Sequence, residues 1–138
     1  MWKGRVTEND SEAIVIPNPV TFTGAVSVGG VSFNALVSYD ANAAIAIAPF
    51  AAKLTKSSAG AYTIADPSTA QEGTRILITA QTAQAHTVSN TGGSGFNAGG
   101  ASTIKATFGG AIGDCMEIVA INGKWNVILL KNVSLGTA

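Results

Sequence analysis

Two alternating runs joined by an Asn-Gly pair are the strongest constraint on the fold of this chain. The runs are CMEIVAI at residues 115–121 and KWNVILL at residues 124–130, and Asn122-Gly123 stands between them. Alternation of apolar and polar residues is typical of a strand with one buried face. Asn-Gly is the pair best suited to the type I′ turn of a two-residue hairpin. The segment therefore predicts a β-hairpin.

Shorter runs of the same kind occupy much of the chain from residue 61 onward. AYTIAD, TRILITA and AHTVSN lie at residues 61–66, 74–80 and 85–90, and turn-forming or polar residues bound each of them. Their order indicates successive antiparallel strands. Another strand is expected at residues 103–108, where apolar and polar residues alternate again. We predict an all-β fold, with a compact antiparallel β-sandwich or barrel-like domain.

The region before residue 54 predicts a β-ribbon. VTFTGAVSV is followed by two glycines and by VSFNA, in which the alternation resumes, so we expect a hairpin over residues 20–37. Residues 41–52 are rich in alanine but contain Pro49, and we expect a short strand and a bend there. Because a two-stranded ribbon is barely stable alone, residues 20–53 are interpreted as an oligomerisation region.

The chain has little charge with which to cover its surface. Charged residues make up 12% of it, against about 25% in a typical soluble domain. The eight Lys and Arg residues are matched by eight Asp and Glu residues, which favours self-association over dispersion. We therefore expect a homo-oligomer, most simply a trimer, in which copies bury surface against one another.

The same composition excludes several classes of partner. The basic residues are scattered and form no stripe that could neutralise phosphates, so we expect no nucleic acid. No window approaches the roughly 18–20 apolar residues of a membrane span, and the N-terminus lacks the apolar core of a signal peptide. We expect a protein that is made in a cytoplasm and does not bind membranes.

The beginning of the chain differs from the rest in its charge. Charged residues crowd into the first dozen positions, and Pro17 and Pro19 separate them from the first alternating run. The sequence thus predicts three regions, which are an arm at residues 1–19, the ribbon at residues 20–53 and a distal β domain at residues 54–138.

Few residues are available for chemistry, since the chain has one histidine and one cysteine. His86 lies in a strand-like run with no nucleophile elbow nearby, and we expect it to form hydrogen bonds within a sheet or at an interface. Cys115 is expected to be a small buried side chain. Asp114 and Glu117 fall on opposite faces of a continuous strand, so solvated charges explain them better than a catalytic pair. We predict no enzyme activity, no metal and no cofactor.

Three motifs carry a resemblance to a known family. They are Ala85-His86-Thr87-Val88, then Ala106-Thr107-Phe108-Gly109-Gly110 with Gly113-Asp114, and finally Asn122-Gly123-Lys124-Trp125. With them, residues 54–138 resemble a segment that recurs in head-fibre and capsid decoration (cement) proteins of tailed bacteriophages. Related segments occur in phage tail fibres.

The resemblance implies a structural virion protein on the outer surface of the capsid. Such a protein would act as a homotrimer, bind the major capsid protein of the phage head and have no catalytic residue. We interpret the arm as the capsid-attachment segment. Its candidate residues are Trp2, Lys3, Arg5, Glu8, Asp10 and Glu12.

An alternative function is that of a tail-fibre or receptor-binding adhesin that recognises a host-surface glycan. The glycine-rich residues 91–102 lack the Lys-Ser/Thr pair of a phosphate-binding loop, so we interpret them as a flexible surface loop. Phe96 and Asn97 would be its ligand-binding residues, together with Trp125. Trp125 alternates with Val127 and Leu129, however, which favours a core or interface position.

Overall fold

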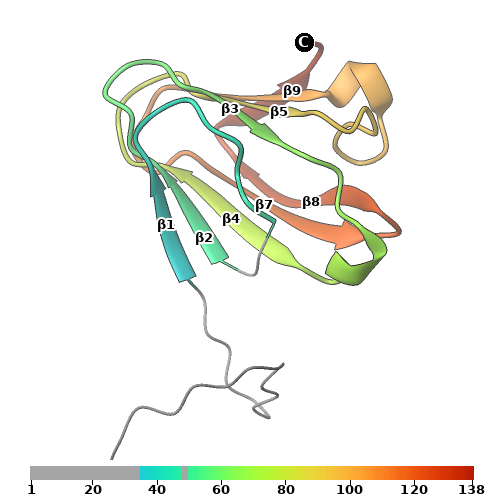
Figure 1. Cartoon of the computed structure of the whole chain (residues 1–138). Helices are drawn as coiled ribbons and strands as arrows, with labels where there is room; N and C mark the ends of the chain where they lie inside the picture. Colours follow the sequence, from blue (N-terminus) through green and yellow to red (C-terminus); the bar gives the residue numbers. More distant parts are fainter. Residues whose placement is uncertain (1–34, 48–49) are drawn as a thin grey trace, which may run out of the picture. The chain divides into compact units, whose positions relative to one another are not determined.

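The computed structural model describes residues 35–47 and 50–138, and these residues form an all-β domain (Figure 1). Two single-turn helices, η1 (Thr69–Gln71) and η2 (Gly100–Thr103), interrupt the strands. The strands are β1 (Ala35–Tyr39), β2 (Phe50–Leu54), β3 (Ala61–Ile64), β4 (Arg75–Ala80), β5 (Thr87–Asn90), β6 (Lys105–Phe108), β7 (Cys115–Ile121), β8 (Lys124–Lys131) and β9 (Val133–Gly136).

The strands form two sheets that face each other. Sheet A has the order β1-β2-β4-β7-β8, and sheet B has the order β3-β5-β6-β9. Both sheets are mixed, because β1, β2 and β4 pair in parallel, as do β3 and β5, whereas the remaining pairs are antiparallel. The predicted all-β class is confirmed. The predicted antiparallel arrangement is wrong for the first half of the domain, and the described strands do not close into a barrel.

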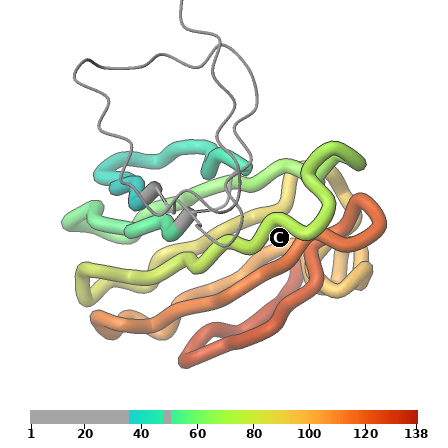
Figure 2. Tube along the Cα trace, turned by 90° about the horizontal axis from the view of Figure 1, so that it is seen from below, coloured from blue at the N-terminus to red at the C-terminus, as the bar shows by residue number. Residues whose placement is uncertain are grey.

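The parallel pairs β2–β4 and β3–β5 arise because the chain passes from one sheet to the other after each strand from β2 to β4. It runs from β2 in sheet A to β3 in sheet B, returns to β4 in sheet A, and crosses again to β5 in sheet B. Even the segment between β1 and β2 touches sheet B, through a single parallel bridge from Ala44 to Thr63. Figure 2 shows the resulting progression from the N-terminal strands at one end of the domain to the C-terminal strands at the other.

The core lies between the sheets and follows the alternation of the sequence. In β4, Ile76, Ile78 and Ala80 are fully buried, and in β6 Ala106 and Phe108 are too. These side chains point to the same side of their strand because strand residues two apart share a face. The largest buried side chains are those of Trp125, Tyr62, Phe96 and Phe108.

The β7–β8 hairpin is confirmed, but with an irregularity that changes the exposure of β8. Ile121 pairs with Lys124, and Asn122 and Gly123 have φ of 52° and 69°, as a type I′ turn requires. A β-bulge between Glu117 and Ile118 shifts the register.

The bulge separates the side chains that we expected on one face of β8. Trp125 is buried and Val127 packs against the core, whereas Leu129 lies opposite Glu117 and is exposed. Ile128, the extra residue of β8, is exposed as well. The prediction of a single face holding Trp125, Val127 and Leu129 is therefore wrong beyond Val127.

The predicted arm lies outside the described residues, and so does the ribbon as far as residue 34. Residues 35–37 belong to β1, which pairs with β2, and β2 pairs in turn with β4. In the described part of the chain, the segment that we assigned to the ribbon thus forms two strands of the same sheet as the distal domain.

Candidate functional site

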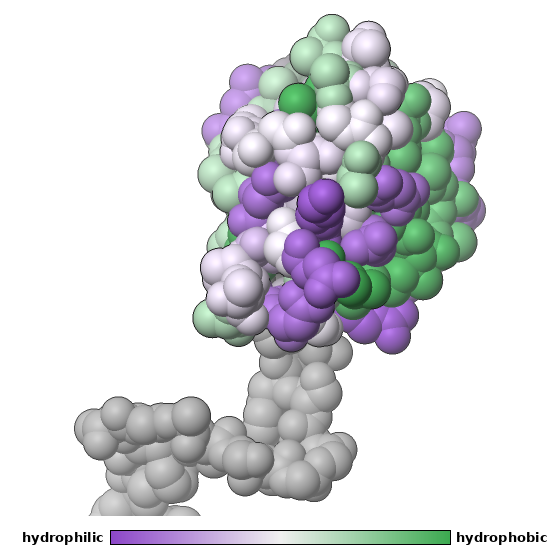
Figure 3. Space-filling view, turned by 90° about the vertical axis from the view of Figure 1, so that its right-hand side faces the viewer, coloured by the Kyte–Doolittle hydropathy of each residue, from purple (hydrophilic) through white to green (hydrophobic). Residues whose placement is uncertain are grey.

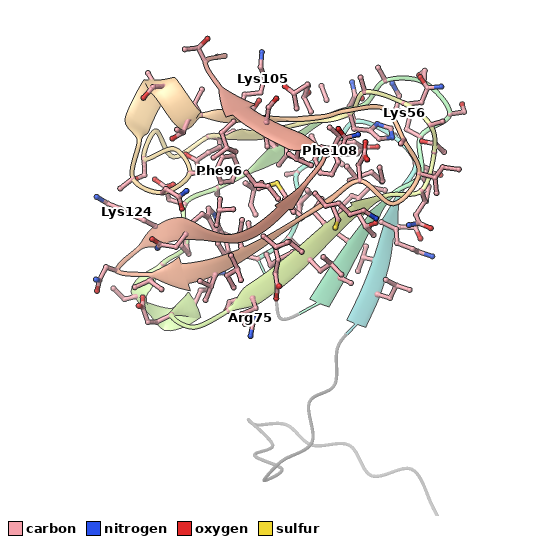
Figure 4. The ribbon with its side chains drawn as sticks, turned by 180° about the vertical axis from the view of Figure 1, so that it is seen from behind. Lys56, Arg75, Phe96, Lys105, Phe108 and Lys124 are labelled. Atoms are coloured by element: carbon pink, nitrogen blue, oxygen red, sulfur yellow. The ribbon has the colours of Figure 1, made fainter. Side chains whose placement is uncertain are left out.

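The glycine-rich segment has a defined structure and holds its aromatic residue inside the domain. Phe96 is fully buried and forms a parallel bridge with Trp125. Figure 4 shows Phe96 and Phe108 between the two sheets, with labelled lysines at the periphery. Asn97 is exposed, but its N–H donates to Trp125 O at 2.8 Å and its Oδ1 accepts from Val127 N–H at 2.7 Å. The interpretation of this segment as a flexible loop that presents Phe96 is therefore not supported.

Asn90, at the end of β5, organises the same segment from within. Its Oδ1 accepts hydrogen bonds from the N–H groups of Gly93 and Gly95, at 3.1 and 3.2 Å. Its Nδ2 donates to Asp66 Oδ1 at 2.7 Å. A buried amide that makes all these bonds fixes the backbone around it, since each bond would leave an unsatisfied group if it opened. Sequence reasoning missed this role of Asn90.

His86 joins two chain segments, the β2–β3 and β4–β5 connections, through both of its ring nitrogens. Its side chain is fully buried, and Nδ1 accepts from the N–H of Gly60 at 3.0 Å. Nε2 lies 2.8 Å from Thr82 Oγ1, and that hydroxyl donates its proton to Lys56 O at 2.8 Å. Thr82 must therefore accept a hydrogen bond, so His86 is neutral with its proton on Nε2.

The surroundings of His86 keep it neutral. Burial lowers its pKa below the ordinary value, and the charge of Lys56 lowers the pKa further. The ring of Tyr62 packs edge-on against it at 5.7 Å between centroids, and Tyr39 packs in the same way on Tyr62 at 6.3 Å. With both nitrogens engaged and no exposed surface, His86 has the structural role that its sequence context predicts.

Asp114 fixes the corner where β6 leads into β7. It is almost fully buried, which corrects the interpretation as a solvated charge. Its Oδ2 accepts from Ala111 N–H at 2.8 Å and its Oδ1 from Asn132 Nδ2 at 2.9 Å. The Ala111 N–H and then the Asn132 amide hold the pKa of this carboxyl below its usual range. Glu117, by contrast, lies on the strand and pairs with Arg75 at 2.7 Å.

A shallow hollow of about 260 Å³ adjoins this corner. Its lining residues are Thr107, Phe108, Gly109, Asn132, Val133 and Ser134. Gly109 is required there because a Cβ at this position would lie 2.3 Å from Asn132 Nδ2. The hollow contains no titratable side chain, and in the described part of the chain no three His, Cys, Asp or Glu residues gather as metal ligands.

We expect Gly109→Ala to destabilise the domain by about 1–3 kcal/mol, because the new methyl would displace Asn132 and leave the buried Asp114 short of a hydrogen bond. Gly136→Ala is the matched control, since a Cβ at Gly136 meets nothing within 4 Å. Chemical denaturation of both variants measures the difference. Equal stability of the two variants would contradict the role given to Gly109.

The surface feature that sets this domain apart is a set of exposed aliphatic side chains. Figure 3 shows hydrophobic residues gathered along the flank that carries the C-terminal strands. Ile128, Leu129 and Leu130 of β8 are all exposed. Cys115 on the neighbouring β7 is only half-buried, which corrects its expected burial. The run of four apolar residues at the end of KWNVILL, which breaks the alternation, was the one sequence indication of this patch.

No protein-family model, curated protein or solved structure matches the chain. None of the helical segments in residues 35–47 and 50–138 has the length and hydrophobicity to cross a bilayer. The candidate functional site therefore rests on the geometry of the domain itself, and it is the exposed aliphatic surface.

Proposed function

We propose that this chain is a structural protein of the tailed-phage virion, which attaches to the outer surface of the capsid as a homotrimer. The observation that carries the proposal is the exposed aliphatic surface of β8, where three consecutive residues, Ile128, Leu129 and Leu130, are all exposed. An exposed apolar strip of this kind marks a place where a protein contacts another protein. A structural role needs such contacts and no active site.

The residues that carry the family resemblance support a structural role too. His86 joins two segments, Gly109 makes room for Asn132, and Asp114 holds a corner. Asn122 makes the hairpin turn, and Trp125 fills the core. Each of these residues maintains the fold, which is consistent with a structural role. The glycan-binding alternative has no such support, because the rings of Phe96 and Trp125 are buried.

Capsid attachment can be tested by co-sedimentation. The full-length chain is expected to sediment with capsids of its phage that have been purified without it. A variant with Trp2→Ala, Lys3→Ala and Arg5→Ala is expected to bind at least tenfold more weakly, because multivalent attachment magnifies the loss of each arm contact. Lys105→Ala with Lys124→Ala, on the distal domain, is the matched control. Failure of the unmodified chain to sediment with capsids would refute the proposed function.

A further inference from the structure

One row of core-facing residues crosses all five strands of sheet A, and the side chains at its two ends are exposed to solvent. Successive strand pairings place Val37, Ala52, Ile78, Met116 and Leu130 side by side across the whole sheet. The three central residues are fully buried, whereas Val37 and Leu130, at the two ends, are each 38% exposed. Both end residues point toward the core, so the core is open at both edges of the sheet.

The outer face of sheet A also carries exposed aliphatic side chains at both edges, and its middle is not buried, since Leu77 is 39% exposed. The adjacent row runs from Leu36 on β1 through Ala51, Leu77 and Glu117 to Leu129 on β8. Its two ends, Leu36 and Leu129, are exposed by 60% and 46%. Each edge of the sheet therefore presents aliphatic side chains on both faces of an edge strand. Open edges of this kind form hydrogen bonds readily with another strand.

The two edges are complementary in direction. β1, β2 and β4 are parallel, and two successive antiparallel pairings lead from β4 to β7 and β8. β8 therefore runs in the same direction as β1. A second copy in the same orientation would extend sheet A, with its β1 pairing in parallel with β8 of the first copy.

The two edges are complementary in charge as well. Asp40 is exposed and directly follows β1, and Lys131 is the exposed last residue of β8. Within the described residues neither of them makes an ion pair. Parallel pairing brings the C-terminal ends of the two strands together and places Asp40 of one copy beside Lys131 of the next.

Part of β8 is already covered, which limits the free edge. Asn97 bonds to the backbone of Trp125 and of Val127, so the first half of the strand is closed to a partner. Residues 128–131 remain, and this length suits the five residues of β1.

We propose that copies of this chain associate head to tail through sheet A, with residues 128–131 of one copy pairing with β1 of the next. The partner is a second copy of the chain, because each copy carries both halves of the interface. Such a heterologous contact forms a ring when the rotation between copies closes, and three copies are the ring size that fits the proposed homotrimer. This inference deepens the proposed function and rests on its oligomeric character.

Solution mass tests the interface with one substitution at each edge. The unmodified chain is expected to have three times the mass of the 13.9 kDa chain. Val37→Lys and Leu130→Lys are each expected to lower the mass threefold, because either change places a charge in the interface between β8 of one copy and β1 of the next. Ile112→Lys, at a 66% exposed position outside both edges, is the matched control and is expected to keep the full mass. Circular dichroism checks that each variant is folded before its mass is compared.

Mixing the two edge variants separates head-to-tail pairing from other arrangements. Val37→Lys keeps its β8 edge and Leu130→Lys keeps its β1 edge, so their mixture is expected to form a dimer. If Leu130→Lys dissociates the assembly but Val37→Lys does not, β8 pairs with β8 or β1 is covered by another segment, and the head-to-tail contact is wrong. A monomeric unmodified chain would overturn it too.

Charge reversal gives a second test, in which circular dichroism checks the fold of Lys131→Glu because the charge of Lys131 also lowers the pKa of Asp114. Asp40→Lys and Lys131→Glu are each expected to weaken association at least fivefold, and the double variant is expected to recover it. Without recovery, the proposed placement of the two strand ends is overturned.

Capsid co-sedimentation is a separate readout. If the edge variants dissociate as expected but the unmodified chain does not bind capsids, the proposed function alone is refuted. If the unmodified chain binds capsids but Val37→Lys and Leu130→Lys keep the full mass, this inference alone is refuted.

Discussion

Trp125→Ala is expected to destabilise the domain by about 3–5 kcal/mol, as loss of a buried tryptophan typically does. The indole is fully buried, and its Nε1–H donates to Ala65 O at 2.8 Å. Thermal unfolding followed by circular dichroism at a fixed protein concentration should show a fall in Tm on the order of 10–20 °C.

Two controls separate the contributions to this loss. Trp125→Phe keeps an aromatic ring in the core but removes the hydrogen bond to Ala65, and we expect a loss of about 1–2 kcal/mol. Lys124→Ala, at the exposed neighbouring position, should stay within about 0.5 kcal/mol of the unmodified chain. If Trp125→Ala were no worse than Lys124→Ala, the indole would not be part of the core.

Acidification is expected to destabilise the domain through His86. In the unfolded chain a histidine takes up its proton as the pH falls through about 6.5. In the folded domain burial and Lys56 lower the pKa of His86, and a proton on Nδ1 would break the bond from Gly60. Stability is therefore complete above about pH 6.5 and falls as the pH is lowered toward the folded pKa, by at most about 1.4 kcal/mol per pH unit. Urea unfolding between pH 7.5 and 5 measures the slope.

The chain offers a direct control for this pH dependence, because His86 is its one histidine. His86→Gln is expected to be less stable at neutral pH but to lose the slope between pH 7 and 5. A slope that persists in His86→Gln would show that another group is responsible. Asp114 acts at a lower pH, since its lowered pKa makes its contribution disappear only as the pH falls below the usual carboxyl range.

The individual strands could be predicted from the sequence because their information is local. The alternation of TRILITA matches the buried and exposed positions of β4, and Asn122-Gly123 forms the expected turn. A turn dipeptide and a period of two depend on neighbouring residues alone, so no tertiary contact needs to be known.

The assignment of strands to sheets could not be predicted in the same way. Nothing in AYTIAD states that it pairs with AHTVSN, two strands later, and not with TRILITA, which follows it. Both pairings satisfy the same alternation. The choice depends on how the connecting segments cross the core, as His86 shows by joining residues 26 positions apart in the sequence.

The same reasoning explains the errors at the site. Phe96 stands among glycines, which predicts an exposed loop, but its burial depends on the distant Trp125 and on Asn90. Asp114 follows a glycine in a turn, and one of its two side-chain partners, Asn132, is distant in the sequence. The exposure of Leu129 depends on a bulge that the β8 sequence shows only as a run of apolar residues.

The alternation of the chain between the two sheets also governs how the domain can fold on the ribosome. β4 emerges early, but its second neighbour is β7, some forty residues later in the chain. Until β7 and β8 have been translated, β4 is an edge strand, and the buried faces of β2 and β4 lack the neighbouring side chains of β7 and β8. Nascent chains that stop before β7 should therefore stay associated with chaperones, and release should coincide with closure of the fast, two-residue hairpin.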